Sequence, residues 1–180
     1  QKKMFLIVLL VILIAGITLG LFINKNKENK TLEDKKMNII NKISNDITFN
    51  LDKHNVKLNS GYDMPILGLG TWSQNNEECE NSVYNALKDG YRLIDTAQYY
   101  GNEIGVGNGI KKAIAEGIVK RKDIFVTTKV SPGSYYNPDE SIDESLKKLN
   151  LEYIDLLLIH QHGSNDEEVY KAMEKAVNDG

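Results

Sequence analysis

The apolar positions of residues 56–180 alternate between short continuous runs and helical stripes. The runs predict four buried strands, at residues 66–70, 92–95, 123–129 and 154–160. After each run, apolar residues recur at intervals of three and four, which is typical of helices with one buried face. These stripes lie within residues 79–87, 106–114, 142–149 and 169–177. A strand followed by a helix, repeated four times, predicts parallel strands joined by right-handed crossovers.

Local signals mark where the helices begin and end. Gly90 and Gly117 follow the first two stripes, and glycine is typical of the residue that terminates a helix. Before the third stripe, Asn137 is followed by Pro138 and, two residues later, by Glu140. This order is typical of an N-cap, a proline at the first helical position and a capping box. We therefore expect the third helix to begin there.

Two folds accommodate four strand–helix units, namely a doubly wound sheet and half of an eight-unit barrel. Polar residues favour the barrel, because Asp95, Lys129 and His160 each fall at the last position of a different strand. In a barrel, these strand ends share one face, where such enzymes place their active sites. We expect an α/β fold of the parallel (β/α)8 TIM-barrel type with only the first four units present. A hairpin at residues 56–65 is expected before them.

The beginning of the chain has a different pattern. Met4–Ile23 is twenty residues long and contains no charge, so as a helix it spans the roughly 30 Å hydrocarbon core of a bilayer. It is longer than a signal-peptide core, and Thr18 and Gly20 form only a weak cleavage site. More lysines follow the segment than precede it, which places the next domain in the cytoplasm. A membrane-anchored, single-pass protein with a cytoplasmic catalytic domain is therefore expected.

The domain boundaries follow from these patterns. We expect a transmembrane anchor at residues 1–24, a charged linker at 25–54 and the folded domain at 55–180. Within the linker, apolar residues recur at helical spacing, at Met37, Ile40, Ile43 and Ile47. This spacing fits either a short amphipathic helix against lipid or a partly ordered tether, and the sequence leaves both open.

Composition and two short motifs exclude several classes of function. The net charge of −3, with acidic and basic residues well mixed, gives no nucleic-acid-binding surface. Gly105, Gly107 and Gly109 do not form G-x-G-x-x-G and begin ten residues after a strand, so a Rossmann nucleotide site is rejected. His160 and His162 are spaced as metal ligands, but the chain has only three histidines. No metal site is expected.

A longer motif surrounds the second predicted strand. It reads Gly90-Tyr91-Arg92-Leu93-Ile94-Asp95-Thr96-Ala97, followed by Tyr100, Glu103, Val106 and Gly107. Lys129 and His160 follow it, and Gly68-Leu69-Gly70-Thr71-Trp72 precedes it. Through these residues and their spacing, residues 56–180 resemble the N-terminal half of an aldo-keto reductase barrel. Gln161 stands where many eukaryotic members have tryptophan, and here the chain is similar to bacterial relatives.

The resemblance implies four catalytic side chains, Asp95, Tyr100, Lys129 and His160. Tyr100 would donate a proton to the carbonyl oxygen of the substrate, because a cation beside a phenol makes it a better acid near neutrality. Lys129 would be that cation, with Asp95 as its counter-ion. His160 would hydrogen-bond the carbonyl and orient it for hydride transfer.

The resemblance also implies the ligands. NADPH would supply the hydride and lie beside Gly70, Thr71 and Asp95, and Trp72 would line the substrate pocket with His160. We therefore expect an NADPH-dependent oxidoreductase that reduces an aldehyde or ketone to an alcohol. Its expected partners are a small-molecule carbonyl substrate and, through the anchor, the lipid bilayer.

Chain length leaves two other functions open. A barrel of this type takes about 250 residues, and 125 follow residue 55. We expect an incomplete barrel, which is a fragment, a half that pairs with a second half-barrel chain, or a degenerate product. The alternatives to an enzyme are a membrane-bound, non-catalytic accessory subunit that binds a nicotinamide cofactor, and an inactive fragment.

Overall fold

The computed structural model describes residues 25, 27, 29–37, 48–50 and 52–180. The chain divides into two compact units, Gln1–Thr48 and Phe49–Gly180. In the first unit, the described residues up to residue 37 are helical, and Leu32 and Met37 are exposed. The other apolar positions of the expected linker helix lie outside the described residues. The expected boundaries at residues 24 and 54 stay predictions.

The expected membrane-spanning segment, Met4–Ile23, also lies outside the described residues. Within the part of the chain that the structure describes, no helix has both the length and the hydropathy that crossing a bilayer requires. This finding corrects the expectation of a membrane-anchored, single-pass protein with a cytoplasmic catalytic domain. The described residues give no support for the lipid bilayer as a partner.

A small sheet precedes the main one. Its strands are β1 (Thr48–Asn50), β2 (Asn55–Lys57) and β3 (Asp63–Pro65), in the order β1-β2-β3. β2 and β3 are antiparallel, with Val56 opposite Met64, as expected for a hairpin. The turn between them is closed by a hydrogen bond from the Leu58 amide to the Tyr62 carbonyl oxygen, at 2.8 Å.

The main sheet is parallel throughout. It consists of β4 (Gly68–Gly70), β5 (Leu93–Asp95), β6 (Phe125–Val130) and β7 (Leu156–Ile159), in chain order. Gly70 pairs with Asp95, and Asp95 with Thr127. This confirms the predicted α/β fold with parallel strands. The strands are shorter than the apolar runs; Ile66 and Leu67, for example, come before the pairing begins and are exposed.

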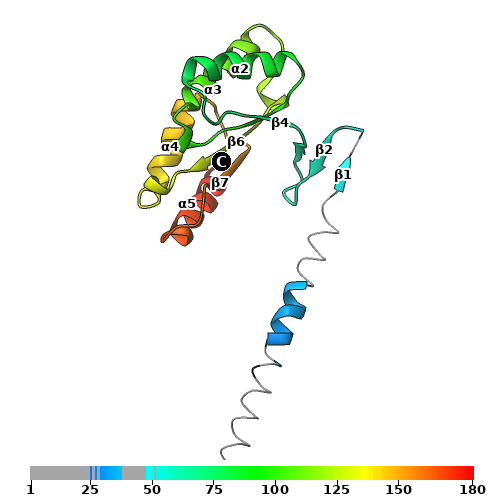
Figure 1. Cartoon of the computed structure of the whole chain (residues 1–180), viewed down its shortest axis with the longest axis vertical. Coiled ribbons are helices and arrows are strands. Elements are labelled where there is room, and N and C mark those ends of the chain that lie inside the picture. Colours follow the sequence, from blue (N-terminus) through cyan, green and yellow to red (C-terminus); the bar gives the residue numbers. More distant parts are fainter. Residues whose placement is uncertain (1–24, 26, 28, 38–47, 51) are drawn as a thin grey trace, which may run out of the picture. The chain divides into compact units, whose positions relative to one another are not determined.

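Four helices alternate with these strands, and Figure 1 shows them in an arc around the strands, from α2 at the top to α5 at the bottom. They are α2 (Asn76–Lys88), α3 (Glu103–Ala115), α4 (Pro138–Leu149) and α5 (Asp166–Asp179). Short 3-10 turns lie in the connections, at η1 (Gln98–Tyr100), η2 (Arg121–Asp123) and η3 (Pro132–Ser134). Gly90 and Gly117 follow α2 and α3 with positive φ angles of 100° and 73°, which confirms both predicted helix ends.

Two apolar clusters hold the helices against the strands. One joins α2 and α3 to β5 and β6, and its fully buried members include Val83, Leu87, Ile94, Ile110 and Val126. The other joins α4 and α5 to β6 through Val130, Tyr135, Ile142, Val169 and Ala172, and Leu157 and Ile159 of β7 pack against it. Because both clusters include β6, this strand is fixed between the two pairs of helices, and its carboxyl end is a well-supported position for a functional side chain.

The capping box lies at a different helix from the one expected. α4 does begin at Pro138 with Asn137 as N-cap, but Asn137 makes no side-chain capping hydrogen bond. α2 has the complete box instead, because the Asn75 and Glu78 side chains each accept the other's backbone amide, at 3.0 and 2.9 Å. An N-cap residue needs extended backbone. Asn75 has it, with ψ of 175°, whereas Asn137 has ψ of 57°.

Three glycines of α3 allow two neighbouring helices to approach closely. A Cβ at Gly105 would clash with the Asn76 carbonyl group, and one at Gly107 with the Leu149 carbonyl group. At Gly109, a Cβ would stand 2.7 Å from the carbonyl oxygen of Glu80. These glycines therefore serve the packing of α3 against α2 and α4, in agreement with the rejection of a nucleotide-binding loop.

Candidate functional site

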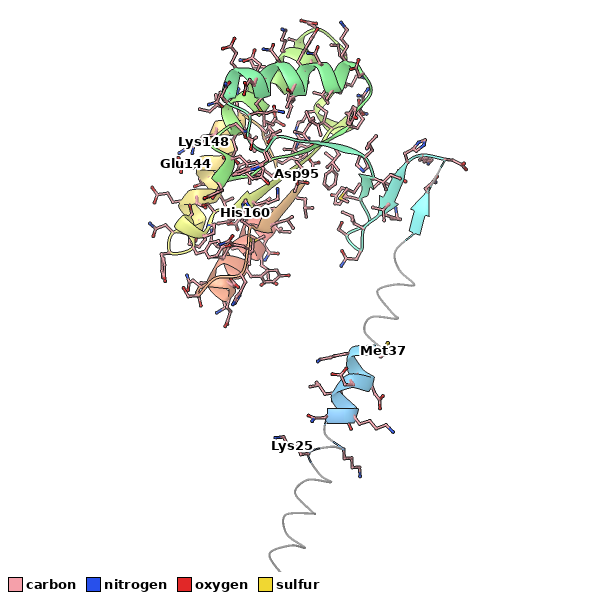
Figure 2. All side chains as sticks on the ribbon, in the orientation of Figure 1. Lys25, Met37, Asp95, Glu144, Lys148 and His160 are labelled. Atoms are coloured by element: carbon pink, nitrogen blue, oxygen red, sulfur yellow. The ribbon has the colours of Figure 1, made fainter. Side chains whose placement is uncertain are left out.

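The parallel strands bring the predicted catalytic residues to one end of the sheet. Asp95 is the last residue of β5, Lys129 is the last but one of β6, and His160 directly follows β7. Since neighbouring strands run in the same direction, their carboxyl ends lie together, as the labels of Asp95 and His160 in Figure 2 indicate. Tyr100 joins them from η1, the turn that follows β5.

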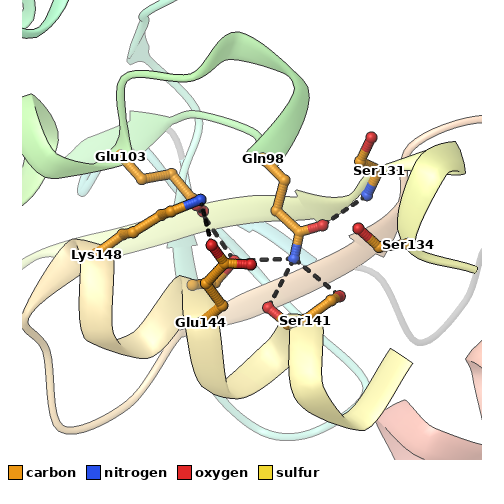
Figure 3. Close-up of a pocket in the computed structure, with 8 residues that line it drawn as sticks. Gln98, Glu103, Ser131, Ser134, Ser141, Glu144 and Lys148 are labelled. Atoms are coloured by element: carbon orange, nitrogen blue, oxygen red, sulfur yellow. Dashed lines mark hydrogen bonds and ion pairs between the residues drawn. The ribbon is translucent and has the colours of Figure 1, made fainter. Parts of the chain in front are cut away.

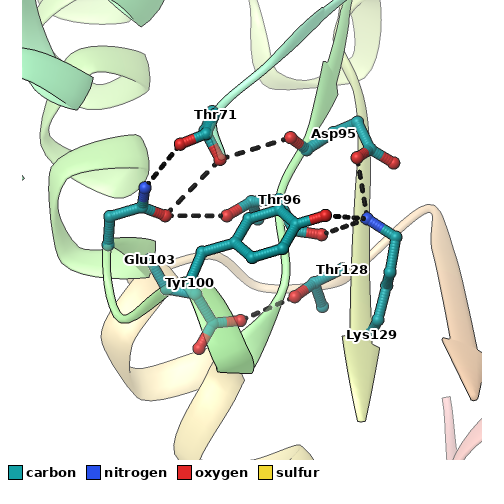
Figure 4. A network of polar contacts seen from close by, with 8 residues as sticks. Thr71, Asp95, Thr96, Tyr100, Glu103, Thr128 and Lys129 are labelled. Atoms are coloured by element: carbon teal, nitrogen blue, oxygen red, sulfur yellow. Dashed lines mark hydrogen bonds and ion pairs between the residues drawn. The ribbon is translucent and has the colours of Figure 1, made fainter. Parts of the chain in front are cut away.

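Lys129 is the centre of this group. Its Nζ lies 2.7 Å from Asp95 Oδ1, 2.9 Å from the Thr96 carbonyl oxygen and 3.3 Å from Tyr100 Oη (Figure 4). An ammonium group has three protons, so these contacts engage all of its donors. The Lys129 side chain is only 14% exposed, and Asp95 is 41% exposed. The ammonium group is thus held in place by protein acceptors, while its carboxylate partner reaches the surface.

His160 lies beside the phenol of Tyr100. Its ring meets the ring of Tyr100 edge to face, at a centroid distance of 5.6 Å. Partial burial and the positive charge of Lys129 lower the pKa of His160, partly offset by Asp95. This lowered pKa favours the neutral imidazole. Its Nδ1 is buried and has no hydrogen-bond partner among the described residues, and such an atom costs about 1–3 kcal/mol until it is paired.

Two exposed aromatic rings form a wall next to these groups. Trp72 packs edge-on against Tyr100, with centroids 4.9 Å apart, and stacks nearly parallel to Tyr99 at 6.0 Å. Tyr99 also meets the His160 ring at 5.8 Å. The structure thus brings Trp72 to the four predicted catalytic residues. The position of Tyr99 was not predicted, because its stacking on Trp72 depends on the conformation of η1.

The residues predicted to bind the cofactor differ in exposure. Gly70 is exposed at the end of β4, next to Asp95. Thr71 is fully buried, and its hydroxyl lies 3.4 Å from the side-chain oxygen of Asn102. Asn102, also buried, donates in turn to the carbonyl oxygens of Thr71 and Gln74, at 2.7 and 3.0 Å. Gly70 and Asp95 therefore offer surface to a ligand, whereas the Thr71 side chain is turned into the protein.

Glu103 is a buried acid next to the site. It is 2% exposed and accepts hydrogen bonds from the hydroxyls of Thr128, at 2.7 Å, and Ser145, at 3.3 Å. Burial raises its pKa above the ordinary value, although both hydroxyls oppose that rise. Glu103 belongs to the motif around the second strand, but its burial depends on α4 and could not be inferred from spacing.

We expect Glu103→Gln to change how stability depends on pH. A raised pKa in the folded state means that Glu103 favours folding below its ordinary value of 4.5 and loses this contribution as the pH rises through the folded-state value. Wild type should therefore lose stability relative to Glu103→Gln as the pH rises from its ordinary value of 4.5 into the neutral range. Urea unfolding of both proteins across this range measures the difference.

Glu144→Gln is the matched control. A hydrogen bond from Lys148 lowers the pKa of Glu144, so its contribution is lost as the pH falls, which gives the opposite slope. Equal slopes for the two variants would contradict the burial of Glu103.

His162, the other half of the His160-x-His162 pair, has a separate partner. Its Nδ1 lies 2.6 Å from Asp166 Oδ2, and its ring is 94% exposed. The two histidines therefore make different contacts. Among the residues that the structure describes, no three metal-ligating side chains are grouped together.

Comparison with known proteins identifies the family to which the chain is similar. The sequence profile of the Aldo/keto reductase family matches residues 66–180. The NAD(P)H-dependent D-xylose reductase I,II of Candida tropicalis is 47% identical over 108 residues, which is 58% of this chain and 33% of that protein. The NAD(P)H-dependent D-xylose reductase of Scheffersomyces stipitis is 49% identical over 108 residues, again 58% of this chain and 34% of the relative.

Solved structures agree with the sequence relatives. An aldo-keto reductase of Bombyx mori in complex with NADP superposes with a TM-score of 0.63 at 38% identity, covering 68% of this chain and 46% of that one. An aldo/keto reductase from Brucella melitensis gives 0.66 at 41% identity, covering 74% and 50%. The four β/α units thus have the TIM-barrel-like fold of these proteins.

The chain spans about a third of the length of these curated relatives and about half of the solved structures. Within that part, the family profile covers most of the second unit, including every residue of the site described above from Gly70 to His160. The chain belongs to the aldo/keto reductase family.

Proposed function

We propose that this chain carries the catalytic end of an NADPH-dependent reductase that converts an aldehyde or ketone to an alcohol. The observation that carries the proposal is the contact between Lys129 Nζ and Tyr100 Oη, at 3.3 Å, beside the His160 ring. Support also comes from the relatives, which are NAD(P)H-dependent D-xylose reductases, and from the Bombyx mori reductase in complex with NADP.

Tyr100 is the proton donor in this proposal. The ammonium of Lys129 donates its own proton to Tyr100 Oη, so the phenolic proton is free to point toward a substrate oxygen. As negative charge develops on that oxygen, Tyr100 transfers its proton, and Lys129 stabilises the phenolate that remains. Tyr100 is partly exposed and can regain its proton from solvent.

Asp95 and the Thr96 carbonyl oxygen keep Lys129 at the phenol. Both lie within 2.9 Å of its Nζ, closer than the Tyr100 hydroxyl at 3.3 Å (Figure 4). A fixed cation does not need to reorganise when the phenolate forms, which is the main advantage of such an arrangement over water. Asp95 also keeps the site close to neutral overall before the reaction.

His160 positions the substrate carbonyl. A neutral imidazole donates one hydrogen bond, and its lowered pKa keeps a second positive charge away from Lys129. Together with Tyr100, it can hold the carbonyl oxygen from two directions, which fixes the orientation of the carbonyl carbon. The exposed faces of Trp72 and Tyr99 then contact the remainder of the substrate.

The residues present fit a nicotinamide cofactor on the same face. NADPH supplies a hydride to the carbonyl carbon when it is bound. Gly70 would hold it by close approach of the backbone, because a Cβ at that position would meet open space. The exposed Asp95 carboxylate is the second contact. Thr71 would act by fixing the end of β4, since its amide donates to the Asp95 carbonyl oxygen at 3.1 Å.

The test uses the chain and a fusion in which residues 56–180 replace the matching segment of the Scheffersomyces stipitis reductase. Trp72 is the only tryptophan of the chain, so its fluorescence reports NADPH or NADH binding. Aldehyde-dependent oxidation of NADPH by the fusion, lost in Tyr100→Phe and Lys129→Met, is the expected result. A folded fusion that binds NADPH and does not turn over would overturn the proposal. Preference for NADH would overturn the choice of cofactor alone.

A further inference from the structure

The turn that carries Tyr100 is held by a side chain with no part in the proposed reaction. Gln98, the first residue of η1, accepts the Ser131 amide proton through Oε1 at 2.8 Å. Its Nε2 lies 2.9 Å from both the Ser141 carbonyl oxygen and the Ser145 hydroxyl (Figure 3). Gln98 thus joins η1 to the segment after β6 and to α4.

These contacts connect the proposed acid to the proposed cation. Ser131 follows Lys129 by two residues, so the bond from its amide to Gln98 ties η1 to the strand that carries Lys129. Within η1, the backbone contributes the bonds from the Tyr100 amide to Ala97 and from the Gly101 amide to Gln98, at 3.0 and 3.1 Å. A single 3-10 turn is weakly stable by itself. The position of Tyr100 therefore depends on the Gln98 side chain.

A second set of bonds closes a circuit around the same residues. The Ser145 hydroxyl, fully buried, also donates to Glu103 at 3.3 Å. The other oxygen of Glu103 accepts from Thr128, the residue before Lys129, at 2.7 Å. A chain of hydrogen bonds therefore runs from Gln98 in η1 through α4 and α3 to Thr128 in β6. Its two ends lie close in sequence to Tyr100 and Lys129.

Polar contacts, not apolar packing, fill this region. The circuit borders a cavity of about 160 Å³ that is lined by polar and charged side chains. Two of them, Glu144 and Lys148, form an ion pair at 2.9 Å and are well exposed, so solvent reaches the cavity. The hydrogen bonds of Gln98 therefore hold η1 at this cavity, and the rings of Tyr99 and Tyr100 contact Trp72 and His160 elsewhere.

We propose that Gln98 is a positioning residue that sets the contact between the Tyr100 hydroxyl and the Lys129 ammonium group. Its effect on catalysis rests on the proposed function, because it acts through Tyr100. Loss of its amide should release η1 from Ser131 and α4, lengthen the contact from Tyr100 to Lys129 and weaken the stabilisation of the phenolate.

The contact can be tested without turnover. In the full chain with ¹³C-labelled tyrosine, Tyr100→Phe assigns the Tyr100 ring signal, and Lys129→Met gives its shift when the ammonium is lost. Gln98→Met keeps the volume of the side chain and removes its hydrogen bonds. Gln98→Met should move the Tyr100 signal in the same direction as Lys129→Met does. When Lys129→Met is added to Gln98→Met, it should shift this signal less than it does in the wild-type chain. Tyr84, bonded to Glu116 at 2.6 Å, should stay unchanged.

Gln98→Glu tests the acceptor oxygen and the donor nitrogen of the Gln98 amide separately. It keeps the acceptor for the Ser131 amide and loses the donors to α4, so it should retain more of the wild-type Tyr100 signal than Gln98→Met. A merely structural role would lower the melting temperature and leave the Tyr100 signal and its response to Lys129→Met as in wild type, which would overturn the proposal. If Gln98→Met does not fold, Ser145→Ala, which removes one acceptor, is measured in the same way.

Turnover in the fusion provides the second measurement. Gln98→Met should lower kcat by about 10- to 100-fold, the cost of misplacing a reacting group by around 1 Å. The KM for NADPH should not change, because Gln98 hydrogen-bonds to Ser131, Ser141 and Ser145 and not to Gly70 or Asp95. A wild-type fusion without activity would refute the proposed function, while the Tyr100 signal would still decide whether Gln98 positions the phenol.

Discussion

Replacing Tyr100 with phenylalanine is expected to lower the kcat of carbonyl reduction by about 10²- to 10⁴-fold, the usual contribution of a well-placed general acid. Only the hydroxyl is removed, so the edge-on contact with the Trp72 ring can persist. Cofactor affinity, followed through Trp72 fluorescence, should remain close to that of wild type. The measurement is steady-state turnover of the fusion with a nitrobenzaldehyde as substrate.

Tyr99→Phe is the matched control. Tyr99 is adjacent to Tyr100, but it belongs to the aromatic wall and acts through its ring, which stacks on Trp72. Phenylalanine preserves that ring, so kcat should change little. If Tyr99→Phe is the damaging substitution and Tyr100→Phe is tolerated, the proposed acid is misassigned. The roles of Asp95, Lys129 and His160 would then need revision as well, because they were assigned relative to Tyr100.

The order and type of the elements could be predicted because they depend on local patterns. Apolar runs and stripes identified every strand of the parallel sheet and every helix from α2 to α5. The convergence of Asp95, Lys129 and His160 also followed, since parallel strands place their carboxyl ends together. For these residues, position within a strand was enough to determine position in space.

Side-chain contacts of the connecting segments could not be predicted from the sequence. Asn75 and Asn137 have the same capping motif, and only the backbone conformation decides which one caps its helix. Thr71 was expected at the cofactor, yet its hydroxyl is turned toward Asn102, 31 residues away. Gln98 reaches partners 33 to 47 residues away. Each of these side chains is polar and belongs to a connecting segment, where periodicity gives no information about direction.

Residues on strands and the residue on a connecting turn are held in the site by different means. Asp95, Lys129 and His160 lie on or directly after strands, which the apolar clusters make rigid. Tyr100 lies on a one-turn helix, which ring contacts with Trp72 and His160 and the hydrogen bonds of Gln98 secure. The sequence therefore identifies the chemical groups, and the hydrogen-bond circuit through Gln98 supplies the geometry that joins the loop-borne acid to the strand-borne cation.

Gly107→Ala is expected to destabilise the second unit by about 3 kcal/mol or more, the upper range for overpacking. In an exposed helix, this substitution stabilises by up to about 1 kcal/mol, because alanine is the better helix former. Here the added Cβ would meet the carbonyl group of Leu149, the last residue of α4, and backbone cannot rotate away as a side chain can. α3 and α4 would have to separate, which would open the cluster around Val106 and Leu149.

Thermal and urea unfolding of the full chain, followed by circular dichroism, measure this effect. Gly133→Ala is the control, because its φ angle is not positive and the nearest atom to its Cβ would be the Ser131 hydroxyl, at 4.0 Å. That change should leave stability the same or slightly higher, since it removes freedom only from the unfolded chain. If Gly107→Ala is as stable as Gly133→Ala, α3 and α4 do not approach as closely as described. The placement of Glu103 and Ser145, which face each other across the same contact, would then also be wrong.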